Sequence, residues 1–92
     1  MPIAVHPGRI LRREMAARKL SANRLALELG VPSGRITDIA NGKRGITADT
    51  ALRLGRRLGT SAQFWMNLQT RYDLIVAEEK LGRRLATEVR AA

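Results

Sequence analysis

Apolar residues recur every three or four positions along most of this 92-residue chain, which is the spacing of helices that bury one face. No stretch alternates apolar and polar residues as a half-buried strand would. Residues that typically begin or end helices separate the apolar stretches. The pattern predicts five helices, which begin at Pro7, Ser21, Pro32 or Ser33, Thr47 and Ser61, and of which the first four end near Lys19, Gly30, Asn41-Gly42 and Gly59.

The same spacing predicts which residues face the interior. In the fifth helix one face is expected to carry Phe64, Leu68, Tyr72 and Ile75, at spacings of four, four and three. For the first four helices the expected inward residues are Ile10, Leu11, Met15, Leu25, Ala26, Leu29, Ile36, Ile39, Ala51, Leu54 and Leu58. The chain is therefore expected to be all-α.

The length fits one domain. We expect that domain to span residues 1–80. Residues 81–92 are largely polar and are expected to fray or to form a loosely held helix.

The distribution of charge along the chain points to a class of partner. The chain has 17 Lys and Arg against 8 Asp and Glu, a net charge of +9. Twelve of the basic and four of the acidic side chains lie in residues 1–60, so the excess is concentrated in the predicted first four helices. A concentrated positive field attracts a polyanion, and nucleic acid is the first candidate. The alternative is a charged face that serves only solubility.

Several classes of site are expected to be absent. There is no cysteine and only one histidine, His6, so neither a metal site nor a cofactor is expected, and the chain does not look like an enzyme. We expect His6 to cap a helix or to lie on the surface. Neither an apolar run long enough for a membrane span nor a secretory signal is visible, which predicts a cytoplasmic protein.

The second and third predicted helices carry the functional signal. Each has about eight residues, and only the turn Leu29-Gly30-Val31-Pro32 separates them. So tight a turn makes the helices cross steeply, which is the helix-turn-helix geometry. In that geometry the second helix enters the major groove of DNA while the first lies across the backbone.

Further motifs narrow the assignment. The run from Leu20 to Ala26, Gly30-Val31-Pro32 and Arg35-Ile36 resemble the lambda-repressor-like helix-turn-helix proteins. Four more segments resemble the HigA-type antitoxins of toxin–antitoxin modules: His6-Pro7-Gly8, the run from Asn41 to Thr47, the run from Thr50 to Leu54, and Phe64-Trp65-Met66-Asn67-Leu68-Gln69 with Tyr72-Asp73-Leu74. The resemblance implies a homodimer that binds an operator at its own promoter and neutralises a ribosome-dependent, mRNA-cleaving toxin encoded beside it.

Candidate DNA contacts follow from the expected position of each side chain. Arg35 can donate two hydrogen bonds to a guanine edge or can contact a phosphate instead. Ser33 either contacts DNA or caps the third helix, and Asp38 either accepts from cytosine or pairs with a nearby arginine. Gly34 would allow close approach to the DNA. The full set expected at the DNA is Ala22, Asn23, Arg24, Ser33, Gly34, Arg35, Thr37, Asp38, Lys43 and Arg44. A run of charge is usually a solvated face, and this is the main alternative for Arg9, Arg12, Arg13, Arg53, Arg56 and Arg57.

The aromatic residues point to a second surface. Phe64 and Trp65 are adjacent and cannot share one face of a helix, so we expect Trp65 in the core and Phe64 at the border of the dimer or toxin surface. The apolar residues beyond the compact domain need a partner, and we expect a second copy of the chain. The expected dimer interface is Phe64, Tyr72, Leu74, Ile75 and Val76.

Two other functions remain open. One is a phage-type or metabolic repressor with no toxin partner. The other is an RNA-binding or membrane-surface protein that uses its basic patch without sequence preference.

Overall fold

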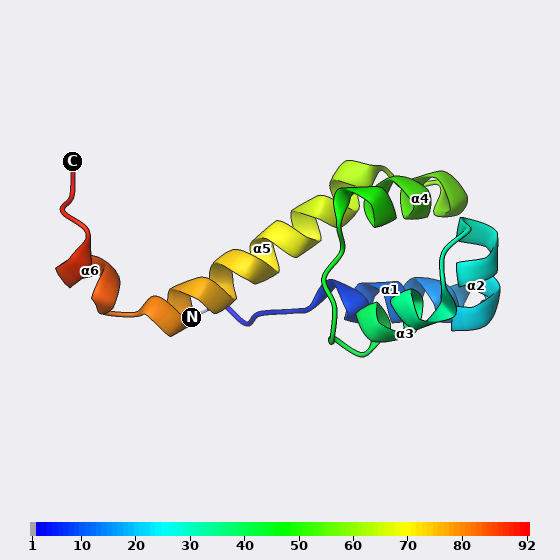
Figure 1. Ribbon diagram of the computed structural model, residues 1–92, viewed down its shortest axis with the longest axis horizontal. Coiled ribbons are helices and arrows are strands. Elements are labelled where there is room, and N and C mark those ends of the chain that lie inside the picture. Colours follow the sequence, from blue (N-terminus) through cyan, green and yellow to red (C-terminus); the bar gives the residue numbers. More distant parts are fainter. Residues whose placement is uncertain (1) are drawn as a thin grey trace.

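The computed structural model describes residues 2–92, which are all-helical as predicted (Figure 1). Their helices are α1 (Pro7–Ala17), α2 (Ala22–Leu29), α3 (Ser33–Ala40), α4 (Ala48–Leu58), α5 (Ala62–Leu81) and α6 (Arg84–Glu88). Helices α1 to α5 are the five predicted helices, and residues 84–88 form a further short helix after Gly82. This short helix lies in the polar extension, where a loosely held helix was one of the two expectations. Among residues 2–92, none of the helices combines the length and the hydropathy that a membrane span requires.

The predicted helix starts are confirmed by their caps. The hydroxyls of Ser21, Thr47 and Ser61 each accept a hydrogen bond from the backbone N–H three residues later, at 3.1, 3.4 and 3.0 Å. The cap of α3 is Pro32, which makes no side-chain cap bond. Ser33 is therefore the first residue of α3 and does not cap it.

His6 caps α1. Its Nδ1 atom accepts a hydrogen bond of 2.9 Å from the backbone N–H of Gly8, which confirms the capping role expected for this residue. Helix α1 ends at Ala17, two residues before the predicted end, and Lys19 then adopts a left-handed backbone conformation with φ of 55°. The close packing of α1 on α3 begins at this capped end, where Gly8 lies against the backbone of Ile39.

The core is built from the predicted inward faces of the first four helices. Leu11, Leu25, Ile36, Ile39 and Leu54 are completely buried. The face predicted for α5 was wrong at its start: Trp65 is completely buried, whereas Phe64 remains 40% exposed. Trp65 packs in the core cluster while its indole N–H donates to the hydroxyl of Thr60 at 2.8 Å, so its polar atom is satisfied as well. This confirms the separate expectation that Trp65 lies in the core.

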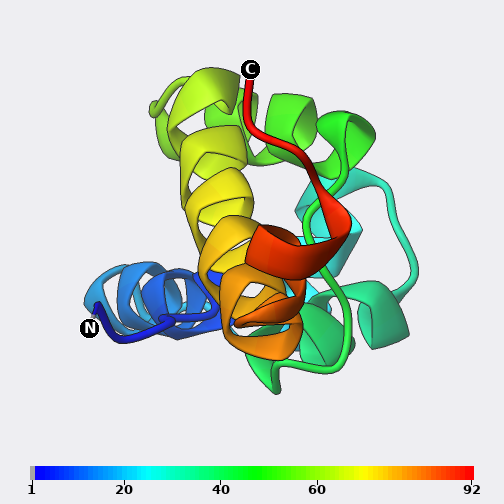
Figure 2. The same ribbon diagram turned by 90° about the vertical axis from the view of Figure 1, so that its left-hand side faces the viewer.

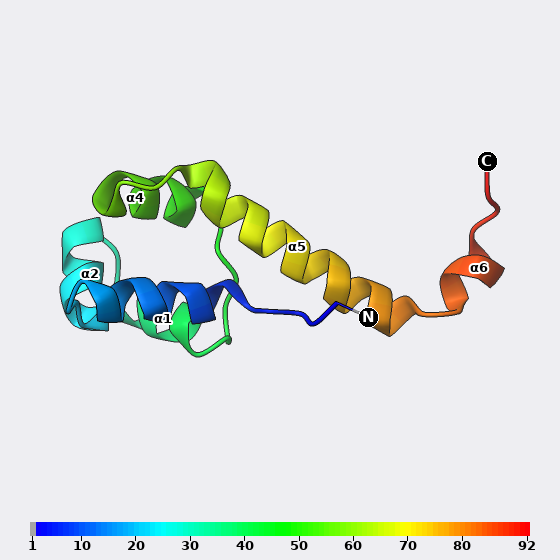
Figure 3. The ribbon, with the colours of Figure 1, turned by 180° about the vertical axis from the view of Figure 1, so that it is seen from behind.

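The shape is elongated, with extents of 48 × 21 × 21 Å. Helices α1 to α4 and the first half of α5 form a compact head, and the second half of α5 projects from it with α6 at its end (Figures 1 and 3). Seen along the long axis, α5 lies in front of the head and crosses between α4 and α1 (Figure 2). The fold therefore offers two distinct regions, the basic head and the projecting arm.

Candidate nucleic-acid interface

Helices α2 and α3 form the predicted helix-turn-helix. Gly30 adopts the left-handed conformation, with φ of 74°, that closes α2, and the N–H of Val31 donates to the carbonyl of Ala26 at 3.0 Å. Pro32 then starts α3 at once. Ile36 and Ile39, on one side of α3, are completely buried. The opposite side of α3 therefore faces outward, along the lower edge of the head in Figure 1.

The outward side of α3 carries the predicted contact residues. Ser33, Gly34 and Thr37 are exposed, and Arg35 and Asp38 are half-buried at its flanks. The hydroxyl of Thr37 donates to the carbonyl of Ser33 at 3.1 Å, so its lone pairs remain open to an outside donor. A Cβ built on Gly34 would meet no atom within 4 Å, which leaves space for another molecule to approach this backbone closely.

Arg35 is held by a residue that the sequence analysis did not identify. One Nη atom of its guanidinium lies 3.4 Å from a carboxylate oxygen of Asp49, in the first turn of α4. The same oxygen accepts a hydrogen bond of 2.8 Å from Nε of Arg53. The alternative that Asp38 pairs with a nearby arginine is wrong: within residues 2–92 Asp38 forms no ion pair, and Asp49 takes that place. The only signal in the sequence was the i,i+4 spacing of Asp49 and Arg53, which does not reveal Arg35.

One of the predicted contact residues at the start of α2 is engaged in an ion pair. Asn23 and Arg24 are exposed and Ala22 is half-buried, but Nε of Arg24 lies 2.7 Å from Glu28. Glu28 also pairs with Arg57 of α4. The bonds from Arg57 and Arg24 lower the pKa of the Glu28 carboxyl below its usual value, so this carboxylate stays charged and offsets part of the arginine charge.

The loop after α3 holds unpaired charge. Lys43 and Arg44 are exposed, and neither has an acidic partner within residues 2–92. The loop itself is ordered by a hydrogen bond of 2.8 Å from the N–H of Lys43 to the carbonyl of Asp38, and by Gly42, whose φ is 75°. A fixed loop with two free cations fits a phosphate backbone.

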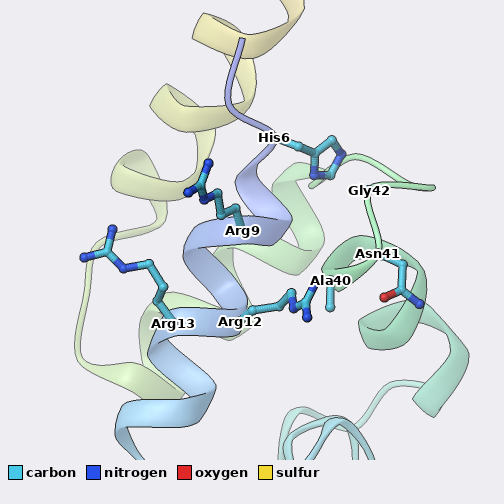
Figure 4. Close-up of a pocket in the computed structure, with 7 residues that line it drawn as sticks. All are labelled: His6, Arg9, Arg12, Arg13, Ala40, Asn41 and Gly42. Carbon is cyan, nitrogen blue, oxygen red and sulfur yellow. The ribbon is translucent and has the colours of Figure 1, made fainter. Parts of the chain in front are cut away.

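A second group of unpaired cations lies on α1. Arg9, Arg12 and Arg13, with His6 and the segment 40–42, line a depression of about 510 Å³ beside the end of α3 (Figure 4). Arg12 extends from α1 toward Ala40, and Arg9 and Arg13 point away on the other side. None of the three has an acidic partner in the part of the chain that the structure describes. Through Arg12, basic charge therefore continues from the end of α3 onto α1.

The expected dimer residues lie on the projecting arm and at its root. Leu74 is 65% exposed, and Phe64 stacks edge-on against Trp65 with ring centroids 5.1 Å apart. Tyr72 and Val76 are half-buried, and the Tyr72 ring packs edge-on against His6 at 4.9 Å. Ile75 is buried within the single chain at 8% exposure and offers little surface to a partner. Leu74 and Phe64 are thus the members of this set with the most accessible surface.

No cluster of three or more potential metal-ligating side chains occurs among the described residues.

Comparison with known proteins agrees with this geometry. The helix-turn-helix family model matches residues 11–65. The chain is 54% identical over 77 residues to virulence-associated protein I of Dichelobacter nodosus, a match that spans 83% of this chain and 71% of that protein.

Solved structures are similar over nearly the whole chain. An addiction module antidote protein of the HigA family from Coxiella burnetii is 47% identical, with a TM-score of 0.94 over 99% of this chain and all of that one. The Pseudomonas aeruginosa antitoxin HigA, solved with the higBA promoter, is 44% identical, with a TM-score of 0.92 over 96% of this chain and 97% of that one. The chain therefore belongs to the helix-turn-helix proteins of the HigA antitoxin family.

Proposed function

We propose that this protein is an antitoxin and an autorepressor, which binds operator DNA as a dimer and neutralises a toxin encoded beside it. It acts in the cytoplasm and by binding alone, without catalysis. The observation that carries the DNA part is the outward side of α3. The opposite side of this helix is fixed in the core by two completely buried isoleucines, and unpaired cations lie nearby on α1 and on the loop after α3. The similar Pseudomonas aeruginosa antitoxin HigA, solved with the higBA promoter, supports DNA binding by this chain.

In the proposed complex α3 lies in the major groove. Arg35 donates two hydrogen bonds to the edge of a guanine, and Thr37 and Ser33 contact neighbouring groups. Asp38 has no ion-pair partner within residues 2–92, which leaves its carboxylate free to accept from a cytosine amino group. Gly34 lets the helix backbone approach the DNA.

Contacts to phosphates fix the position of α3 without reading sequence. They come from Lys43 and Arg44, and from Ala22, Asn23 and Arg24 at the start of α2, where backbone N–H groups favour an anion. The unpaired arginines of α1 add to this field. Because neutralised phosphates release counterions, the affinity is expected to fall steeply with salt.

The dimer forms through the α5 arm, where Leu74 is the most exposed of the expected interface residues. Two copies of α3 then enter successive major grooves, with half-sites about 34 Å apart.

The toxin part of the proposal rests on membership of the HigA family. We infer that the partner is a small, ribosome-dependent, mRNA-cleaving toxin. The alternative is a repressor of the phage or metabolic type that has no toxin. Co-purification from the native operon separates the two, because the antitoxin carries a second small polypeptide with it and the plain repressor does not.

The DNA part is tested by comparing binding to the promoter of its own gene with binding to a random duplex across a salt series. A specific regulator prefers the promoter at every salt concentration, whereas a general polyanion binder shows no preference. Replacement of Arg35 by alanine is expected to cost about 1–3 kcal/mol on the promoter and to relax the preference at one base pair. An equal loss on both duplexes would show that Arg35 contacts only the backbone.

A further inference from the structure

Asp49 places a negative charge next to the helix that is proposed to read DNA. It is 58% exposed and lies in the first turn of α4. With Arg35, Arg44 and Thr47 it lines a hollow of about 250 Å³ between α4, α3 and the preceding loop. A carboxylate beside DNA phosphates weakens binding to any duplex.

The contacts of Asp49 show what it holds. Its Oδ1 atom accepts from Nε of Arg53 at 2.8 Å and lies 3.4 Å from an Nη atom of Arg35. Arg53 in turn donates from Nη1 to the carbonyl of Leu29 at 2.8 Å, at the end of α2. One chain of contacts therefore runs from the turn of the helix-turn-helix through α4 to the side chain of Arg35.

This chain leaves Arg35 able to read a base. A guanidinium has five N–H donors in a rigid plane, and Asp49 engages only one of its two terminal nitrogens. The edge formed by Nε–H and the other terminal nitrogen remains open to a guanine. Fixing the plane beforehand reduces the rotamer entropy that Arg35 loses when it binds.

Arg44 provides the contrast. It lines the same hollow but has no acidic partner within residues 2–92. A side chain that contacts a phosphate needs only its charge, whereas a side chain that reads one base needs a fixed orientation. Arg35, which is held by Asp49, therefore suits the reading of a base, and Arg44, which is not held, suits a phosphate contact.

We infer that Asp49 is a specificity-determining positioning residue, which holds the guanidinium of Arg35 in the orientation that reads a base and thereby increases discrimination between operator and random DNA. The inference rests on the proposed function, since it needs Arg35 at a base edge.

The test first enriches a duplex from a randomised pool with the unmodified protein, and then measures dissociation constants for that duplex and for a random one. The variants are Asp49→Asn, Arg35→Ala and the double variant. Glu28→Gln is the matched control, because Glu28 also bridges two arginines but lies on α2 beside the predicted phosphate contact Arg24. Binding of the random duplex reports whether each variant is folded.

Asp49→Asn is expected to bind the random duplex more tightly and the enriched duplex more weakly, by up to about fivefold, which is the most that an exposed ion pair usually contributes. Glu28→Gln is expected to tighten binding to both duplexes and to leave their ratio unchanged. In the Arg35→Ala background, Asp49→Asn is expected to leave the ratio unchanged as well, because the positioned side chain is gone.

Three results contradict the inference. If Asp49→Asn keeps or improves the preference for the enriched duplex, Asp49 restrains Arg35 without orienting it. If the loss is as large in the Arg35→Ala background, Asp49 acts on its own. If the unmodified protein enriches no sequence at all, the proposed function fails first, and the inference fails with it.

Discussion

Gly8 lies against Ile39 so closely that a Cβ atom built on Gly8 would be 1.8 Å from the carbonyl oxygen of Ile39. This contact seats the first turn of α1 on the end of α3. Replacement of Gly8 by alanine is therefore expected to push the two helices apart and to lower the free energy of unfolding by about 1–3 kcal/mol, the usual cost of overpacking. Urea denaturation measures the loss. A variant as stable as the parent would mean that α1 can shift without cost.

Gly34 is the opposite case, because a Cβ there meets no atom of the protein within 4 Å. Alanine favours a helix over glycine by about 1 kcal/mol at interior positions, and by less in the first turn. Gly34→Ala is expected to raise the melting temperature and to weaken operator binding, since the added methyl group occupies the space proposed for DNA. Calorimetry and a gel-shift titration provide the two measurements. A more stable variant with unchanged operator affinity would remove Gly34 from the interface.

Gln69 joins α5 to the loop before α4. Its side-chain oxygen accepts from the N–H of Ile46 at 2.6 Å, and its nitrogen donates to Asp73 at 2.8 Å. Gln69→Leu leaves the buried N–H of Ile46 without a partner and is expected to cost about 1–3 kcal/mol of stability. Gln63→Leu is the control, because Gln63 bonds only to Asn67 on the exposed surface of the same helix. Equal effects in chemical denaturation would show that the buried bond contributes no more to the free energy of unfolding than the exposed one.

The His6 ring predicts a pH dependence. Burial lowers the pKa of His6 from its usual 6.5, and this effect outweighs the charge of Asp73 and the Arg44 backbone, which raise it. The unfolded chain therefore takes up the proton first as the pH falls below 6.5. The stability contributed by neutral His6 is complete above that pH and is lost as the pH falls toward the lower, folded-state pKa.

This dependence is measured by urea denaturation at a series of pH values on both sides of 6.5. The loss of stability on acidification is expected to be smaller in His6→Asn, whose side chain still caps α1 but does not titrate. Parallel curves for the two proteins would place the acid sensitivity elsewhere in the chain.

The proposed dimer is tested at two leucines of equal exposure. Leu74 on α5 and Leu52 on α4 are both 65% exposed. Leu74→Glu is expected to give a monomer in light scattering, because it places a charge in the interface, whereas Leu52→Glu is expected to keep the oligomeric state of the parent. A dimer that survives both changes would place the interface on another surface.

Local chemistry explains why much of the fold could be predicted. Ser21, Thr47 and Ser61 start their helices through bonds to residues three positions away, and Gly30 and Gly59 close helices through their own backbone conformation. The buried faces of α2, α3 and α4 follow from spacing alone. Nothing beyond a few neighbouring residues is needed for these features.

The features that the sequence did not predict depend on how distant parts of the chain pack together. Phe64 and Trp65 are adjacent and both apolar, so spacing could not show that the buried face of α5 starts at Trp65; the position of α4 decides this. Asp49 lies 14 residues from Arg35, and only the packing of α4 against the helix-turn-helix brings the two together. Asp38, by contrast, is near Arg35 in sequence but forms no ion pair within residues 2–92.

The projecting half of α5 has a consequence for DNA geometry. A helix of 20 residues is about 30 Å long, and the second half of α5 extends beyond the head (Figures 1 and 3). If two copies meet along these arms, the point at which the arms cross sets the distance between the two heads. Moving that point by one helical turn moves each head by about 5.4 Å. Related repressors could thus acquire new operator spacings through changes in the arm, with the base-reading residues left untouched.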